Sequence, residues 1–343
     1  MGTSSKTDFL SLKEIFQPIS HELSVIDDII KSVFKNFEGQ IIQQALDVLI
    51  NSPGKRIRPA LFVLSAHTAL AQENSKKQLN QSLLEIAAAV ELIHQGSLLH
   101  DDLLDEAVIR HGVKTINEVW GNKVAVFLGD YVCARAFKIL TLYGDQRVLN
   151  CLGDAVKMMC EGELIQIINR GNFLMSQEHI MAIIKKKTSL LFEACCYLGA
   201  ALVTENEKAK EGLSKYGINF GIAFQLIDDL RDLVDEHEKL GKHPAQDIHS
   251  GDITLPLSYL FNAINQRTKG DSLKRLTMLD PKVDTVKIRR ICLSSGVLSD
   301  MRGVIESYLV ETKNALAVLA DSDYKTCLCQ IVDYMSHMVP NVV

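Results

Sequence analysis

The sequence lacks the features that mark nucleic-acid-binding and membrane-spanning proteins. Its 37 lysine and arginine residues are outnumbered by 42 acidic ones, and the net charge is -5. Proteins that neutralise phosphate backbones need a basic excess, which is missing here. We also find no apolar run of the roughly 18 residues that a membrane-spanning helix requires. We therefore expect no nucleic-acid partner and no transmembrane segment.

Zinc-binding cysteine pairs and a secretion signal are also missing. None of the eight cysteines has CxxC spacing, and most lie in apolar helical patterns, as buried thiols in a reducing compartment do. The first ten residues, MGTSSKTDFL, contain no apolar signal core, and Lys6 stands where a myristoylation motif has serine or threonine. These absences favour a cytoplasmic protein.

No linker divides the 343 residues, because segments rich in proline, glycine or serine and long charge runs are absent. We expect a single domain over residues 1–343. Apolar residues recur at steps of three and four almost throughout, as from Leu83 to Ile93, which is the periodicity of helices. The sequence therefore predicts an all-α bundle of about a dozen helices. They are expected at residues 20–35, 38–51, 57–71, 77–105, 123–143, 146–170, 176–202, 205–236, 253–265, 283–295, 299–320 and 325–338.

Two acidic DDxxD motifs end long apolar segments, one of them the central segment 77–105. Their carboxylates belong to Asp101, Asp102, Asp105, Asp228, Asp229 and Asp232. Residues one helical turn apart share a face, so each set of carboxylates can converge. A single DDxxD is common on a solvated helix. Two copies, each after a helix that should be buried, indicate Mg²⁺ binding, since buried acids need a metal or an opposite charge.

Basic residues suited to phosphate accompany the acidic motifs. In GKRIRP, Lys55 and Arg58 lie about one helical turn apart. Arg110 follows the first motif, and Lys187 with Thr188 interrupts an apolar helix. A basic cluster alone is usually solvated surface. Opposite two acidic motifs, it indicates a site that holds a diphosphate between metal ions and cations.

Seven segments in order, from about Lys55 to Pro256, resemble the trans-isoprenyl (polyprenyl) diphosphate synthases of the medium- or long-chain type. They are GKRIRP, ELIHQGSLLHDDLLDE, FLGDYVCARAF, GELIQ, KKKTSLL, GIAFQLIDDLRDL and GKHPAQDIHSGDITLPL. The resemblance implies helices around a deep central cavity, a homodimer, and three Mg²⁺ bridging both motifs to an allylic diphosphate. It implies Mg²⁺-dependent head-to-tail 1'-4 addition of isopentenyl diphosphate to geranyl or farnesyl diphosphate.

The resemblance also implies roles for individual residues. The isopentenyl diphosphate site would comprise Lys55, Arg58, His94 and His111. The allylic diphosphate would be held by Arg110, Lys187 and Lys242. The catalytic set beside the developing allylic cation would be Lys187, Thr188 and Gln225. No protein nucleophile is required, because the departing diphosphate can take the final proton.

Gly96 and Ser97 bear on product length. Ser97 lies one turn before Asp101 on the same face, and one turn rises about 5.4 Å, comparable to an isoprene unit. The resemblance implies that bulky residues here stop growth early, so we expect a product of C20 or longer. Close helix packing also requires small residues, and side chains at 132–140 could set the limit instead.

Three departures from the family pattern bear on substrate binding: the first and last affect the isopentenyl side, and the second removes a cation that would face a diphosphate. His111 stands where relatives usually have a second arginine, and Asp252 replaces the lysine of GKxTLP. Residues 338–343 lack the basic tail common in relatives. Weaker binding of isopentenyl diphosphate, or dependence on a partner subunit, would follow from these changes.

Two alternative functions share part of the pattern. A class I terpene cyclase also ionises its substrate with metal ions, but GKRIRP and a second DDxxD argue against it. A non-catalytic subunit of a heteromeric synthase is the other alternative. Such subunits tend to lose the aspartates, whereas all six are present here.

Overall fold

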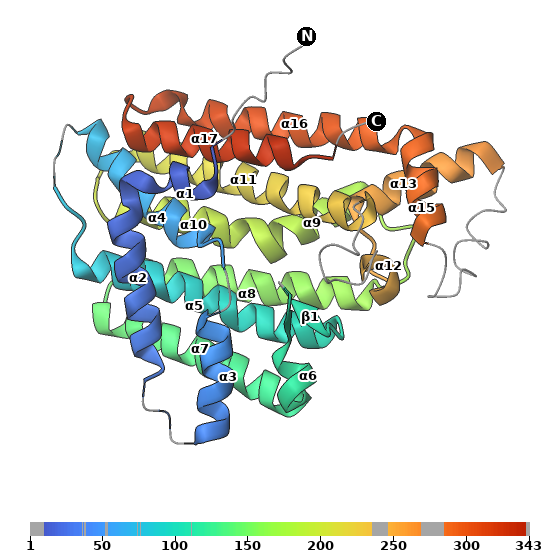
Figure 1. The fold of residues 1–343 in the computed structure, drawn as a ribbon. Coiled ribbons are helices and arrows are strands. Elements are labelled where there is room, and N and C mark those ends of the chain that lie inside the picture. Colours follow the sequence, from blue (N-terminus) through green and yellow to red (C-terminus); the bar gives the residue numbers. More distant parts are fainter. Residues whose placement is uncertain are drawn as a thin grey trace, which may run out of the picture.

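The computed structural model describes residues 10–35, 37, 39–51, 54–73, 75, 77–110, 112–234, 246–268 and 285–340. These residues form a helical bundle with one small hairpin (Figure 1). The first part contains α1 (Leu12–Ile15), the 3₁₀ turn η1 (Gln17–Ile19), α2 (Ser20–Val33), α3 (Gln40–Asn51), α4 (Ile57–Gln72) and α5 (Gln81–Leu104). The middle contains β1 (Ile109–Arg110), β2 (Val113–Lys114), α6 (Ile116–Trp120), α7 (Asn122–Tyr143), α8 (Gln146–Ile168), α9 (Gln177–Ile184), the π turn η2 (Lys185–Ser189) and α10 (Leu190–Ala201). The last part contains α11 (Glu207–Val234), α12 (Gln246–Ser250), α13 (Leu255–Thr268), α15 (Thr285–Ser295), α16 (Val297–Ala315), the 3₁₀ turn η4 (Leu316–Val318) and α17 (Asp323–Met338).

The all-α prediction is confirmed, and every expected segment contains a helix. The segment expected at 176–202 is interrupted by the π turn between α9 and α10. Four short elements were missed, namely α1, η1, α6 and α12, because they are too short to show a period. The hairpin of β1 and β2 was also missed. It pairs Ile109 with Lys114 and Arg110 with Val113, two residues a strand, which is too short for alternation to show.

Helix α5 forms the centre of the bundle and packs along α7, with further contacts to α2 and α4 (Figure 1). Its residues from Ile86 to Ile93 are buried without interruption. Within the described part of the chain, α5 is long and apolar enough to span a membrane by length and composition, although charged side chains interrupt its apolar residues. However, 72% of its apolar window is buried inside the protein. This burial is what the core helix of a bundle requires.

The helix directions bring both acidic motifs to the same end of the bundle. Helices α5, α8 and α11 all finish near β1 and α12, on the right of Figure 1. The turns from α7 to α8 and from α10 to α11 lie at the opposite end. Because carboxylates at helix C-termini face the negative end of the helix dipole, this end of the molecule needs positive charge.

Candidate active site

The first acidic motif occupies the last turn of α5 and its C-cap. Asp102 is buried and accepts a hydrogen bond from Arg110 Nε, 2.5 Å from its Oδ1 atom. Burial raises the pKa of Asp101 to about 6. The positive charge of Lys187 lowers this pKa, and the negative charge of Glu163 raises it. Burial also raises the pKa of Asp105. The motif therefore concentrates negative charge where little water is available to solvate it.

The second motif ends α11 and is joined to the π turn by side-chain hydrogen bonds. Thr188 Oγ1 donates to Gln225 Oε1 at 2.7 Å, and Gln225 Nε2 donates to Asp229 Oδ1 at 2.7 Å. Asp229 is buried, and this burial raises its pKa. Asp232 accepts the backbone N–H of Asp247 at 3.3 Å. The predicted pair Thr188 and Gln225 is thus connected directly to a predicted metal ligand.

Lys187 lies between the two motifs. Its Nζ atom is 2.6 Å from Glu163 Oε2, and Asp101, Asp105 and Asp229 are all within its electrostatic range. Burial opposes the charge on this amine, but the carboxylates of Asp101 and Glu163 outweigh burial and raise its pKa. Lys187 therefore remains protonated and supplies positive charge shared by both acidic motifs.

The π turn that carries Lys187 depends on close contact with α8. A Cβ atom on Gly162 would lie 2.9 Å from the backbone nitrogen of Lys187, so only glycine permits this approach. π turns inside helices occur frequently at functional sites, because the extra residue redirects the side chains that follow. The polar KKKTS sequence in an apolar helix was the sequence signal, but the change of helix type was not predicted.

The GKRIRP segment separates into structural and site-facing residues. Arg56 adopts a left-handed conformation with φ of 50° and pairs with Asp27 at 2.8 Å and Glu91 at 2.9 Å, which anchors the start of α4. The Lys55 amine lies 5.9 Å from the centre of the Tyr334 ring. Burial and Arg231 lower the pKa of Lys55, whereas Asp228 raises it, which places Lys55 beside the second motif.

Arg58 lies in the first turn of α4, and its side chain contacts the buried ring of Phe192. Its guanidinium carbon lies 4.3 Å from the centre of the Phe192 ring, and Asp101 is within its electrostatic range. Its Nε atom is buried without a hydrogen-bond partner among the described residues.

His94 is half-buried on α5, two turns before Asp101. Two other predicted site residues, His111 and Lys242, lie outside the described residues.

Gly96 and Ser97 differ in what surrounds them. A Cβ atom on Gly96 would lie 2.5 Å from the sulfur of Cys133 and 3.1 Å from the backbone oxygen of Gly129, so glycine is needed for α5 to pack on α7. This contact supports the packing explanation for Gly96. Ser97 is half-buried, and its hydroxyl donates to the backbone oxygen of His94 at 2.9 Å. The product-length hypothesis therefore rests on Ser97.

Three further charged residues near the motifs were not singled out from the sequence. Glu163 pairs with Lys187, and Asp247 is tied to Asp232. Arg170, just after α8, pairs with Asp252 at 2.9 Å and with Asp105 at 3.6 Å. Glu163 and Asp247 lie inside the GELIQ and GKHPAQD segments, which could have identified them. Arg170 belongs to none of the seven segments.

The acidic set fits a hard divalent cation that the substrate also binds. Within the described part of the chain, no three acidic, histidine or cysteine side chains are grouped closely enough to hold a metal ion unaided. Mg²⁺ usually takes one or two carboxylates and completes its shell with phosphate oxygens and water. Carboxylates from both motifs at one end of the bundle match that coordination. Burial, and to a lesser extent Glu163 and Asp105, raise the pKa of Asp101, and a bound cation would favour its charged form.

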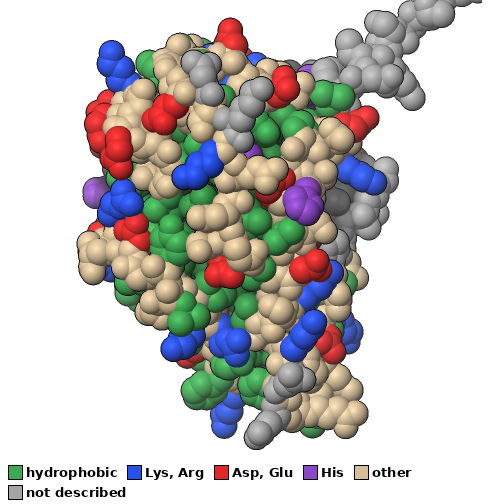
Figure 2. All heavy atoms as spheres, turned by 90° about the vertical axis from the view of Figure 1, so that its left-hand side faces the viewer, with side chains coloured by type: hydrophobic (Ala, Val, Ile, Leu, Met, Phe, Trp, Pro, Cys, Tyr) green, Lys and Arg blue, Asp and Glu red, His purple; other side chains and the backbone are tan. Residues whose placement is uncertain are grey.

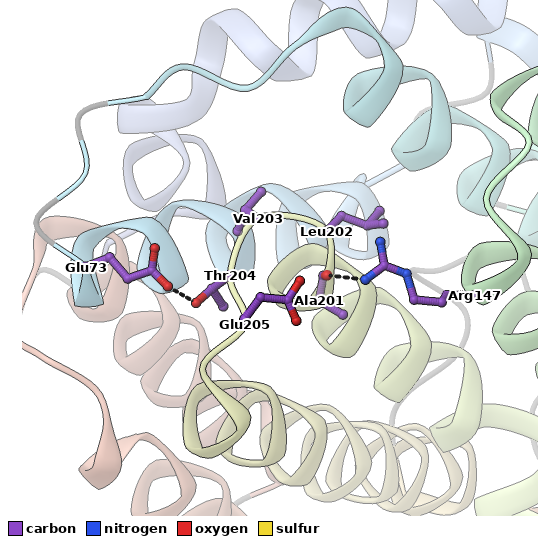
Figure 3. Close-up of a pocket in the computed structure, with 7 residues that line it drawn as sticks. All are labelled: Glu73, Arg147, Ala201, Leu202, Val203, Thr204 and Glu205. Carbon is purple, nitrogen blue, oxygen red and sulfur yellow. Dashed lines mark hydrogen bonds between the residues drawn. The ribbon is translucent and has the colours of Figure 1, made fainter.

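A hollow of about 400 Å³ lies at the opposite end of the bundle, the end that faces the viewer in Figure 2. It is lined by Glu73, Arg147, Ala201, Leu202, Val203, Thr204 and Glu205 (Figure 3). Its polar groups are bound to one another, since Arg147 donates to the backbone oxygen of Ala201 at 3.3 Å and Thr204 donates to Glu73. This hollow contains no part of the acidic motifs, which makes it a poor candidate for the active site.

Comparison with known proteins shows to which protein family the chain with these two acidic motifs belongs. The sequence profile described as polyprenyl synthetase matches residues 39–292, which is most of the chain. The chain belongs to the polyprenyl synthetase family. It is therefore a trans-prenyltransferase, and the family predicted from the seven segments is confirmed.

Similar members of the polyprenyl synthetase family come from bacteria and archaea. The octaprenyl diphosphate synthase of Escherichia coli (strain K12) is 38% identical over 299 residues, 85% of this chain and 88% of that protein. The geranylgeranyl diphosphate synthase of Methanosarcina mazei is 31% identical over 332 residues, 95% of this chain and 98% of that protein. A polyprenyl synthase from Caulobacter crescentus CB15, complexed with calcium and isoprenyl diphosphate, superposes with a TM-score of 0.86 at 29% identity. The alignment covers 95% of this chain and 97% of that one.

Proposed function

We propose that this chain is a Mg²⁺-dependent synthase that condenses isopentenyl diphosphate with an allylic diphosphate and releases a linear product of C20 or longer. The observation that supports this best is Lys187, which lies partly buried between two DDxxD motifs and pairs with Glu163 at 2.6 Å. Two similar proteins are named octaprenyl diphosphate synthase and geranylgeranyl diphosphate synthase, which supports a medium- or long-chain product. Geranyl and farnesyl diphosphate are the proposed primers.

The six motif aspartates would hold the metal ions, of which we propose three. Bound Mg²⁺ would stabilise the negative charge of the departing diphosphate. Lys187 and Arg110 would contribute fixed positive charge to the same diphosphate, with Lys242 as a third proposed cation. Arg110 already contacts the first motif through Asp102, so it can bind phosphate oxygens beside that carboxylate.

Thr188 and Gln225 would orient the reacting end of the allylic substrate. The hydrogen-bonded chain from Thr188 through Gln225 to Asp229 fixes both side chains relative to the second motif. Lys55 and Arg58, with His94 and His111, would bind isopentenyl diphosphate on the side of α4. The buried apolar residues of α5 and α7 would keep water away from the allylic cation, which water would otherwise capture.

We also propose that the enzyme is a cytoplasmic homodimer of one domain each. A single hydrophobic cluster extends from Ile15 to Val339, which supports one domain. Large apolar side chains are exposed along α7 and α8, and we propose that some of them contact the second subunit. They are Phe127, Leu142, Leu164 and Ile168.

Turnover by the purified chain tests the proposed function. Radiolabelled isopentenyl diphosphate should be incorporated with a geranyl or farnesyl primer in Mg²⁺, and EDTA should abolish incorporation. Reversed-phase chromatography of the dephosphorylated product gives its length. Release of hydrocarbon and diphosphate from the allylic substrate alone would instead indicate a terpene cyclase. Incorporation only after addition of a second protein would indicate a heteromeric enzyme, although the full aspartate set and the similarity to whole synthases favour neither alternative.

Ser97→Phe should shorten the main product. Ser97 lies on α5 one turn before Asp101, so a phenyl ring there would fill space beneath the acidic motif without removing a carboxylate. The first condensation should remain within about threefold of wild type, because the substitution removes no side chain proposed to bind the metal ions or either diphosphate. Ser97→Ala is the matched control and should leave the product unchanged. If both variants give the wild-type product distribution, the chain-length limit lies elsewhere.

A further inference from the structure

Asp252 and Arg170 form an ion pair that joins two distant parts of the chain at the acidic motifs. Asp252 is 3% exposed and accepts from Arg170 Nε at 2.9 Å and from Arg170 Nη2 at 3.4 Å. The hydroxyl of Ser250 donates to the same carboxylate at 3.0 Å. A buried aspartate with three donors is well satisfied, so it can fix the arginine in one orientation.

The backbone supports the same arrangement. Gly171 donates its N–H to the backbone oxygen of Gly251 at 2.8 Å, directly beside the ion pair. Gly251 has a φ of +79°, a conformation that favours glycine, and this turn presents Asp252 to the end of α8. The backbone N–H of Asp252 in turn donates to the backbone oxygen of Asp247 at 2.8 Å. The position of Arg170 is therefore fixed by main-chain as well as side-chain bonds.

The guanidinium of Arg170 faces the first acidic motif from this anchored position. Its Nη2 atom lies 3.6 Å from Asp105 Oδ1, and Glu163 is also within its electrostatic range. The Arg170 side chain is 27% exposed, so its guanidinium contacts the buried Asp252 and is also accessible to a ligand. A guanidinium has five N–H donors, so it can keep the bonds to Asp252 while others bind phosphate oxygens.

We propose that Arg170 is a further binding residue for the allylic diphosphate, and that Asp252 is the positioning residue that holds it there. This proposal rests on the proposed synthase function. Aspartate at 252 removes a positive charge at a position where the family pattern has lysine. Arg170 returns a positive charge to the same place from the end of α8, close to Asp105 of the first motif. The pair carries no net charge, so Arg170 offsets the charge of Asp252 and offers N–H donors where the family pattern has a lysine amine.

Affinity for inorganic pyrophosphate in Mg²⁺, measured by calorimetry on the full chain, tests the proposal directly. Arg170→Gln should weaken pyrophosphate binding at least about tenfold, because hydrogen bonds between charged groups are the stronger ones. Arg147→Gln is the matched control, since Arg147 also pairs with an aspartate, Asp145, but at the opposite end of the bundle. It should leave pyrophosphate affinity unchanged.

Two further measurements separate substrate binding from a purely structural role. In Arg170→Gln, KM for the allylic diphosphate should rise at least about tenfold, while KM for isopentenyl diphosphate changes less than about twofold. The double variant Arg170→Gln/Asp252→Lys places the cation on the other residue, and its pyrophosphate affinity should return to within about fivefold of wild type. The melting temperature without ligand shows whether each variant is folded.

The outcomes are distinguishable. Unchanged pyrophosphate affinity in Arg170→Gln, or a KM increase for isopentenyl diphosphate alone, would overturn the proposal. A lowered melting temperature with no recovery of affinity in the double variant would also overturn it, because the pair would then serve only to hold the segment. If wild type itself neither binds pyrophosphate nor turns over, the proposed function fails and this proposal fails with it.

Discussion

Replacing Asp101 by alanine should lower kcat at least about a hundredfold, which corresponds to roughly 3 kcal/mol of lost transition-state stabilisation. Asp101 lies in the last turn of α5, and burial already raises its pKa to about 6. Removal of this carboxylate takes away an oxygen ligand where charge on the leaving diphosphate must be stabilised. Steady-state incorporation of isopentenyl diphosphate at saturating substrate gives the measurement.

Asp154→Ala provides the control for the Asp101 variant. Asp154 lies on α8, and its side chain is 73% exposed, so its loss should leave kcat within about twofold of wild type. The concentration of Mg²⁺ required for half-maximal activity should rise in Asp101→Ala and stay constant in the control. Near-normal turnover of Asp101→Ala, or full activity of wild type in EDTA, would contradict the assignment of Asp101 as a metal ligand.

The long helices could be predicted from the sequence because each one buries a stripe with a clear period. Helix α5 begins where Asn80 caps it, with the side chain accepting the N–H of Leu83, so the expected start at residue 77 was a few residues early. Helix α11 was predicted at 205–236 and observed from Glu207 to Val234. Short elements and the π turn were missed because fewer than two turns carry no usable period.

The grouping of the candidate site residues could be predicted where they lie in compact motifs, whereas their roles stay predictions. The acidic motifs, Lys187 and the Thr188–Gln225 pair are close together in the structure, as the sequence led us to expect. Arg170 could not be found in this way, because its partner Asp252 is 82 positions later and neither residue alone indicates an ion pair. From the sequence alone, Asp252 was noted only as a residue that replaces the lysine of the family's GKxTLP pattern.

Gly96 illustrates a different limit of the sequence. Small residues before the first motif are compatible with an open cavity and with close helix packing, and the sequence does not separate the two. The contact between Gly96 and Cys133 shows that packing of α5 against α7 requires glycine there. Such a contact depends on which residue of a second helix stands opposite, which periodicity does not reveal.

Lys187→Gln should lower kcat/KM for the allylic diphosphate at least about a hundredfold. The amine of Lys187 lies within electrostatic range of both acidic motifs, and Asp101, Asp105 and Glu163 raise its pKa against the effect of burial. Glutamine keeps much of the side-chain volume but removes the charge, so the acidic motifs would repel an incoming diphosphate more strongly. Lys187→Arg should retain more activity, because it keeps the charge with altered geometry.

Lys186→Gln is the matched control, because Lys186 precedes Lys187 in the same π turn but turns toward Glu161, 3.1 Å away. The control should keep kcat/KM within about twofold of wild type, since a partly exposed ion pair contributes little. Loss of Lys187 also leaves the carboxylate of Glu163 without its partner, so the variant's melting temperature must be compared with that of the control. A loss of activity in a folded Lys187→Gln protein assigns the charge to substrate binding. Equal activities of the two glutamine variants would show instead that Lys187 only neutralises Glu163.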